Sequence, residues 1–227
     1  SCKSSDWLEG EKDIMCRQCK TVFPVRAGSV DFVSTLNRNY KNPEEKFIFN
    51  RALENWELIL ENRVSDVPET FHFIHFVNFF GTIRTLLKGV VLEIGCGPGY
   101  DAHLVAQQYP ELSYYCVDIG KYIEVLAQRD RFLANLHYIR GDALSLPLES
   151  EVADSVIAYG VFHHTPDPQK CMDEAYRGLK SGGNIFIYLY KNHEDNLIKR
   201  IGTQVEKLLM YFLAAIPIKV ARMFCWA

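Results

Sequence analysis

The sequence predicts an α/β fold, with a doubly wound, mostly parallel sheet that follows N-terminal helices and a small cysteine-bearing segment. Two observations predict this class. From Val90 to Tyr190, short apolar runs alternate with amphipathic segments, as in consecutive βαβ units. The first apolar run also ends in the glycine-rich turn GCGPG, where a strand meets a helix.

The alternation places each element in order, and strands that alternate with helices imply right-handed crossovers and a parallel sheet. The predicted strands are Val90–Ile94, Ser113–Val117, Leu136–Arg140, Ala153–Tyr159 and Asn184–Tyr190. The predicted helices are Tyr100–Gln108, Tyr122–Arg129 and Gln169–Leu179. Residues 89–190 are therefore interpreted as one α/β domain.

The flanking regions have other patterns. Residues 1–34 are polar and cysteine-bearing, whereas residues 43–88 have helical periodicity and begin with Pro43, a favoured first-turn residue. We interpret residues 43–88 as a helical cap. The aromatic run Phe71–Phe80 within it packs in the core or forms a lid, and we favour the core. Residues 191–227 are also predicted to be helical, and because the chain ends within an apolar run we expect a truncated C-terminus. The absence of an initial Met suggests a lost upstream segment.

Composition excludes several classes of protein. The 227 residues are 48% hydrophobic and 23% charged, as in globular proteins. A net charge of -3 gives no general attraction to nucleic acid or anionic membranes. The apolar stretch Leu208–Ile218 is shorter than the roughly 20 residues of a membrane-spanning helix. Seven cysteines, an odd and scattered set without an N-terminal secretory signal, favour a reduced, cytoplasmic protein.

The glycine-rich turn and two aspartates predict a ligand site at the carboxyl ends of the strands. Gly95, Gly97 and Gly99 allow close approach of the backbone to a ligand. Their G-x-G-x-G spacing differs from the G-x-G-x-x-G of dinucleotide sites. Asp118 ends the second strand, where it can accept hydrogen bonds from ribose hydroxyls, and Asp142 follows the third, where it can accept from an adenine amino group.

The segments EIGCGPG, VD, GDALSLPL, YGVFHHTPDP and LKSGGNIFIYLY resemble the motifs of class I S-adenosylmethionine-dependent methyltransferases, especially the small-molecule group that includes ubiquinone-biosynthesis enzymes. The resemblance covers roughly residues 85–190 and implies the Rossmann-like methyltransferase fold. It implies Glu93 near the methionine amino group, the three glycines at the methionine end, Asp118 on the ribose, and Asp142 with Ala143 at the adenine. The remaining cofactor-binding residues that it implies are Cys96, Ile119, Gly141 and Tyr159.

The resemblance implies direct in-line transfer of a methyl group to a small-molecule acceptor. The sulfonium of S-adenosylmethionine is itself the activated group, so the protein orients the acceptor and excludes water. A general base is needed only where the acceptor loses a proton. His163 and His164, which follow the fourth strand, are the candidate bases. The alternative is that the pair shapes the loop.

The first cysteines form a candidate metal site. Cys16 and Cys19 form a C-x-x-C knuckle, and Cys2 precedes them. The run CRQCKTVFPVRAGSVDFV resembles the second half of the zinc-ribbon segment that precedes some bacterial methyltransferase domains. This resemblance implies Cys2, Cys16 and Cys19 as three of four zinc ligands. The alternative is a degenerate, metal-free segment with free thiols.

Two other functions stay open at this point. A nicotinamide-dependent oxidoreductase is disfavoured by the glycine spacing and by the segment Gly141-Asp142-Ala143. A non-catalytic cofactor-binding or protein-interaction module would use the cysteine segment or the C-terminal helix. The sequence determines neither the methyl acceptor nor the oligomeric state, because specificity lies in the variable loops and helices around the sheet.

Overall fold

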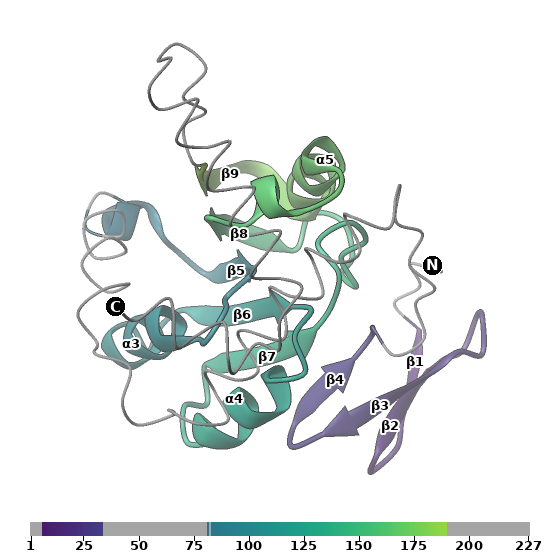
Figure 1. Ribbon diagram of the computed structural model, residues 1–227. Coiled ribbons are helices and arrows are strands. Elements are labelled where there is room, and N and C mark those ends of the chain that lie inside the picture. Colours follow the sequence, from purple (N-terminus) through teal and green to yellow (C-terminus); the bar gives the residue numbers. More distant parts are fainter. Residues whose placement is uncertain (1–5, 34–80, 82, 190–227) are drawn as a thin grey trace, which may run out of the picture.

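The computed structural model describes residues 6–33, 81 and 83–189 (Figure 1). The strands in these residues form one nine-stranded sheet in the order β1-β2-β3-β4-β7-β6-β5-β8-β9. The predicted helical cap before residue 81 and the predicted C-terminal helix lie outside the described residues. Among the described residues, no helix is both long enough and apolar enough to cross a membrane.

The second part of the sheet is parallel and doubly wound, which confirms the predicted fold class. Its elements are η1 (Arg84–Leu86), β5 (Val90–Ile94), α3 (Tyr100–Gln108), β6 (Ser113–Asp118), α4 (Ile123–Arg129), β7 (Leu136–Arg140), β8 (Ala153–Tyr159), η2 (Phe162–His164), α5 (Pro168–Gly178) and β9 (Leu179–Tyr188). The chain proceeds outward from β5 through β6 to β7, and then returns to the other side of β5 for β8 and β9. Strand order therefore reverses between β5 and β8, the place where such sheets bind ligands.

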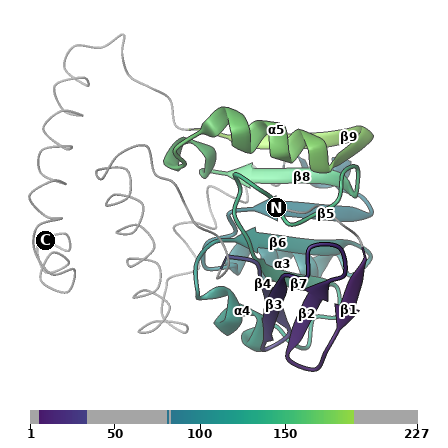
Figure 2. The same ribbon diagram turned by 90° about the vertical axis from the view of Figure 1, so that its right-hand side faces the viewer.

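The helices cover both faces of the parallel strands because alternate strand residues face opposite sides. Val91 and Ile157 belong to one core cluster with residues of α3 and α4. Leu92 and Val156, their neighbours in sequence, belong to a second cluster with residues of α5. Figure 2 shows α5 in front of the sheet, over β8 and β9, and α3 behind it.

Residues 6–33 form a four-stranded extension of the same sheet, here called the N-terminal module. Its strands are β1 (Trp7–Glu9), β2 (Asp13–Cys16), β3 (Val22–Arg26) and β4 (Ser29–Asp31). Neighbouring strands of the module pair antiparallel, whereas β4 pairs parallel with β7. The rings of Trp7, Phe23 and Phe32 pack together, with centroids 4.7–6.0 Å apart. The sequence pattern predicted no strands in this segment.

The last strand differs from its prediction. It begins at Leu179 rather than Asn184 and contains the pair Gly182-Gly183. An irregularity in the pairing between β8 and β9 accommodates the glycines, since Ala153 pairs with Leu179 and Ser155 with Asn184. Packing against β8 therefore prevails over the local preference of two glycines for a turn.

Candidate functional site

The glycine-rich loop lies at the reversal of strand order, between the end of β5 and the start of α3. All three glycines have positive φ, namely 76° at Gly95, 51° at Gly97 and 66° at Gly99, a conformation that residues with a Cβ adopt rarely. The Gly95 N–H donates to the Val117 carbonyl at 2.7 Å. This bond fixes the start of the loop to the neighbouring strand β6.

The three glycines differ in what surrounds them. A Cβ on Gly95 would overlap the Val161 side chain, and one on Gly99 would lie 2.7 Å from the Tyr138 hydroxyl. A Cβ on Gly97 would have no atom of the described residues within 4 Å. Gly95 and Gly99 are therefore required for packing, whereas Gly97 borders space that is open among the described residues.

Asp118 connects the end of β6 to the glycine loop. Its Oδ2 accepts from the Gly97 N–H at 3.0 Å, and its Oδ1 accepts from the Gly120 N–H at 3.0 Å and the Tyr122 hydroxyl at 2.7 Å. Burial raises the pKa of Asp118, and these hydrogen bonds oppose the rise. The carboxylate is thus held in one orientation at the carboxyl edge of the sheet.

Asp142 lies at the same edge, after β7. Its Oδ1 accepts from the Leu144 N–H at 2.9 Å, and the residue is 6% exposed. The Gly141 N–H donates to the Asp118 carbonyl at 2.8 Å, which joins the two strand ends. The structure therefore brings together the two aspartates that the sequence assigned to one site.

A third carboxyl group, Asp101, was missed by the sequence interpretation. It lies in the first turn of α3, two residues after Gly99, and its Oδ1 is buried with no hydrogen-bond partner among the described residues. Burial raises the pKa of Asp101 to about 7. The available signal was an acidic residue two positions after the glycine loop. It was not distinctive, because acidic residues are also common in the first turn of a helix.

Asp101 lies near the buried Glu93. Burial, and then the neighbouring Asp101, raise the pKa of Glu93 to about 8, although the Tyr114 hydroxyl donates to Glu93 Oε2 at 3.0 Å. Asp118 contributes in the same direction. Carboxyl groups gathered in a buried place without a partner cation raise each other's pKa, and a bound cation would relieve this. The cluster suits a positively charged ligand.

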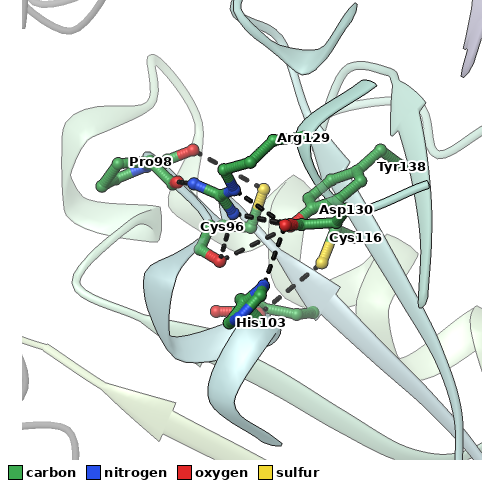
Figure 3. A network of polar contacts seen from close by, with 10 residues as sticks. Cys96, Pro98, His103, Cys116, Arg129, Asp130 and Tyr138 are labelled. Atoms are coloured by element: carbon green, nitrogen blue, oxygen red, sulfur yellow. Dashed lines mark hydrogen bonds and ion pairs between the residues drawn. The ribbon is translucent and has the colours of Figure 1, made fainter. Parts of the chain in front are cut away.

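Arg129, at the end of α4, holds the second half of the glycine loop (Figure 3). Its Nη1 donates to the Pro98 carbonyl and its Nη2 to the Gly99 carbonyl, both at 3.1 Å. Asp130 balances the charge through hydrogen bonds from Arg129 at 2.6 and 2.8 Å. The Tyr138 hydroxyl also donates to Asp130, at 2.7 Å, and His103 Nδ1 lies 2.8 Å from it. This network joins helices and strands that are distant in the chain, and no sequence pattern predicted it.

The candidate bases follow β8. His163 and His164 lie in the short helix η2 with their ring centroids 4.0 Å apart. Desolvation lowers the pKa of both imidazoles, and the neighbouring His164 lowers that of His163 further. Both are therefore neutral at physiological pH and able to accept a proton. Tyr159, at the end of β8, stacks on Tyr188 at the end of β9, with centroids 4.6 Å apart.

The remaining predicted residues have distinct positions. The Cys96 side chain packs in the core and burial raises its pKa to about 11, so only its backbone is available to a ligand. Ile119 and Ala143 directly follow Asp118 and Asp142. Within residues 6–33, 81 and 83–189, no group of three or more His, Cys, Asp or Glu side chains could hold a metal ion. Cys2 lies outside the described residues.

Comparison with known families identifies the parallel half of the chain. A family model for a methyltransferase domain matches residues 92–187, which run from β5 to β9 and include the glycine loop, Asp118 and Asp142. Residues 92–187 are a methyltransferase domain. This match confirms the predicted methyltransferase class for that part of the chain.

Individual relatives agree with this domain assignment. The chain is 34% identical to phthiotriol/phenolphthiotriol dimycocerosates methyltransferase 1 of Mycobacterium ulcerans over 56% of this chain and 46% of that protein. It is 30% identical to the chloroplastic 2-methyl-6-phytyl-1,4-hydroquinone methyltransferase of Spinacia oleracea over 41% of this chain and 27% of that protein. The chain thus spans about half the length of the mycobacterial relatives it matches.

A solved structure supports the fold of the methyltransferase domain. A Methanococcus maripaludis protein assigned as an S-adenosyl-L-methionine-dependent methyltransferase superposes with a TM-score of 0.50. The two chains are 21% identical, and the superposition covers 83% of this chain and 84% of that one. The shared feature is the fold.

Proposed function

We propose that this chain transfers a methyl group from S-adenosylmethionine to a small-molecule acceptor. The observation that carries the proposal is the juxtaposition, within a methyltransferase domain, of the open space at Gly97 with Asp118 and Asp142 at neighbouring strand ends. Two buried acceptors beside a backbone without side chains suit a ligand that carries hydroxyl and amino donors.

The residues around this edge fit the parts of the cofactor. In the proposal, Asp118 and Ile119 contact the ribose, and Gly141, Asp142 and Ala143 contact the adenine. The glycine loop then borders the methionine end. Asp101 and Glu93 bind the α-ammonium group there. This cation stabilises the ionised carboxylates, whose pKa values are raised in its absence.

The acceptor side is formed by the segment after β8. When bound, the cofactor supplies an electrophilic methyl group on a positively charged sulfur. His163 or His164 accepts a proton from an acceptor that must lose one, and its lowered pKa keeps it in the neutral form that this role requires. The stacked rings of Tyr159 and Tyr188 form one wall for the acceptor.

A small-molecule acceptor is favoured by the relatives, whose names specify phthiotriol dimycocerosates and a phytyl hydroquinone as substrates. We extend only the broad class, a small molecule, to this chain. The proposed location is the reducing cytoplasm, where an odd and scattered set of seven cysteines is expected to stay reduced.

Zinc at the N-terminal module is a separate proposal. The chain from Cys16 to Thr21 forms a tight turn, in which the Lys20 N–H donates to the Cys16 carbonyl at 2.8 Å and the Cys16 N–H to the Thr21 carbonyl at 3.0 Å. This turn is the kind of knuckle from which two cysteines ligate zinc. Elemental analysis of the purified chain, with Cys19→Ser as the comparison, should find zinc that the variant lacks. An unchanged metal content would exclude a role for Cys19.

Titration calorimetry with S-adenosylmethionine and S-adenosylhomocysteine tests the function. We expect both to bind, and Asp118→Ala to weaken both by at least about tenfold, because a buried hydrogen-bonded carboxylate contributes about 1.5–3 kcal/mol. Glu111→Ala, at an exposed position, is the control and should bind as the unmodified chain does. Absence of binding by a folded sample would refute the proposal, and binding without turnover on a broad acceptor panel would indicate a non-catalytic module.

A further inference from the structure

The N-terminal module contacts the sheet next to the proposed adenosyl site. In the parallel pairing of β4 with β7, Val30 lies opposite Ile139 and Asp31 opposite Arg140. The Phe32 N–H also donates to the Arg140 carbonyl at 2.8 Å. Arg140 directly precedes Gly141 and Asp142. The last residue of β4 is therefore level with the strand end that carries the adenine-side residues.

The Arg140 guanidinium bridges the module and the loop after β6. Its Nη1 donates to Asp31 Oδ2 at 2.8 Å, and its Nε donates to the Ile119 carbonyl at 3.1 Å. The Arg140 side chain is 14% exposed and the Asp31 side chain 3% exposed. Asp31 Oδ1 accepts from the Val33 N–H at 2.9 Å, which orients the carboxylate. Loss of one partner of such a buried pair leaves the other charge uncompensated.

The Ile119 carbonyl lies within the turn that orients Asp118. The residues on either side of it are Asp118 and Gly120, and the Gly120 N–H donates to Asp118 Oδ1. Asp118 Oδ2 in turn accepts from Gly97. A continuous series of polar contacts thus connects the module to the glycine loop, through Arg140 and the turn after β6.

We propose that Asp31 is a positioning residue of the cofactor site, and that the N-terminal module is part of the framework of that site. Asp31 fixes Arg140, Arg140 fixes the Ile119 carbonyl, and the turn then presents Asp118 to the ribose. The identity of the ligand rests on the proposed function, whereas the series of contacts does not. Supporting contacts of this kind keep ligand-binding groups in their productive geometry.

A second contact of the module, with helix α4, supplies the matched control. Arg26 Nη1 lies 3.3 Å from Glu124 Oε1 of α4, and the Arg26 side chain is 59% exposed. Exposed ion pairs contribute little to stability. Arg26→Ala therefore removes a link between the module and α4 without disturbing Arg140 or Ile119.

Hydrogen exchange of the ligand-free chain, followed by mass spectrometry, tests the positioning directly. We expect Asp31→Asn to accelerate exchange in peptides that contain the Gly97 and Gly120 amides, which Asp118 holds, and Arg26→Ala to leave those peptides unchanged. Faster exchange confined to residues 6–33, or uniform across the chain, would overturn the proposal. If Asp31→Asn does not fold, Arg140→Lys gives the same readout, since lysine lacks the fork that reaches both partners.

Binding of S-adenosylhomocysteine tests the consequence. We expect Asp31→Asn to weaken binding about tenfold, the value of one hydrogen bond to a charged group, and Arg26→Ala to leave it unchanged. Combined with Asp118→Asn, the Asp31 substitution should cost little more, because both act through one carboxylate. Additive losses, or unchanged affinity despite faster exchange, would overturn the proposal. Failure of the unmodified chain to bind would instead refute the proposed function, and the exchange experiment would still decide the positioning.

Discussion

Glu93→Gln should make the ligand-free protein more stable and the cofactor complex weaker. Glu93 is 4% exposed, and burial together with Asp101 raises its pKa from 4.5 to about 8. Since one pKa unit corresponds to about 1.4 kcal/mol, the folded state prefers the neutral side chain by on the order of 5 kcal/mol. Glutamine resembles the neutral acid in shape, and its amide oxygen can accept the hydrogen bond that Tyr114 donates.

The effect has a defined pH dependence. Between the unfolded pKa near 4.5 and the folded pKa near 8, the folded state binds more protons than the unfolded state. The contribution of Glu93 to stability is therefore fully present below about pH 4.5 and is lost as pH rises to about 8. The free energy of unfolding of Glu93→Gln minus that of the unmodified chain should thus increase by about 4 kcal/mol between about pH 5 and pH 9.

Urea denaturation at a series of pH values measures this difference. Glu111→Gln, at an exposed position, should give a profile parallel to that of the unmodified chain. In calorimetry, Glu93→Gln should bind S-adenosylmethionine about tenfold or more weakly, because it lacks the charge that pairs with the ammonium group. A stability difference that does not change with pH would refute the claim that burial raises the pKa of Glu93. Unchanged affinity would refute its role toward the cation.

Three further substitutions test the site. Arg129→Ala should lower the free energy of unfolding by about 3 kcal/mol, since it leaves Asp130 buried without its cation. It should also weaken cofactor binding, because the Pro98 and Gly99 carbonyls lose their donor. Urea denaturation measures the first effect and calorimetry the second, and unchanged affinity would contradict the reasoning. Gly97→Ala should fold, with a free energy of unfolding lower by about 1–2 kcal/mol because of the positive φ at this position. It should also reduce affinity for S-adenosylhomocysteine, because its Cβ enters the open space. Normal affinity would mean that no ligand occupies that space. His163→Ala should reduce kcat about 10²-fold or more on an acceptor that loses a proton. In the unmodified chain, kcat should fall only below about pH 6.5, because the pKa of the imidazole is lowered. An unchanged kcat in the variant would mean that the histidine only shapes the loop.

The sequence predicted the parallel half of the fold because its information is local. Strand residues from Val90 to Tyr159 are apolar in short runs, and a turn with three glycines at positive φ cannot easily be made by other residues. The order of these elements also placed Asp118 and Asp142 at strand ends, and in a parallel sheet such ends lie along one edge. The position of both aspartates at this edge of the sheet was therefore predictable from spacing alone.

The supporting contacts could not be predicted in this way. Asp101 looks like an ordinary first-turn residue, and only its burial beside Glu93 gives it a raised pKa and an orphaned oxygen. Arg129 looks like a surface residue at a helix end, yet it reaches the carbonyls of Pro98 and Gly99, about thirty positions earlier. Such contacts depend on which helix packs beside which loop.

The N-terminal module shows the same division most clearly. The sequence by itself determined a cysteine knuckle, and it predicted a separate small segment. The tertiary structure alone decided that β4 would join the free edge of β7 and place Asp31 beside Arg140. The physical reason is that pairing between distant strands is stabilised by backbone hydrogen bonds and burial, neither of which leaves a periodic pattern in so short a strand.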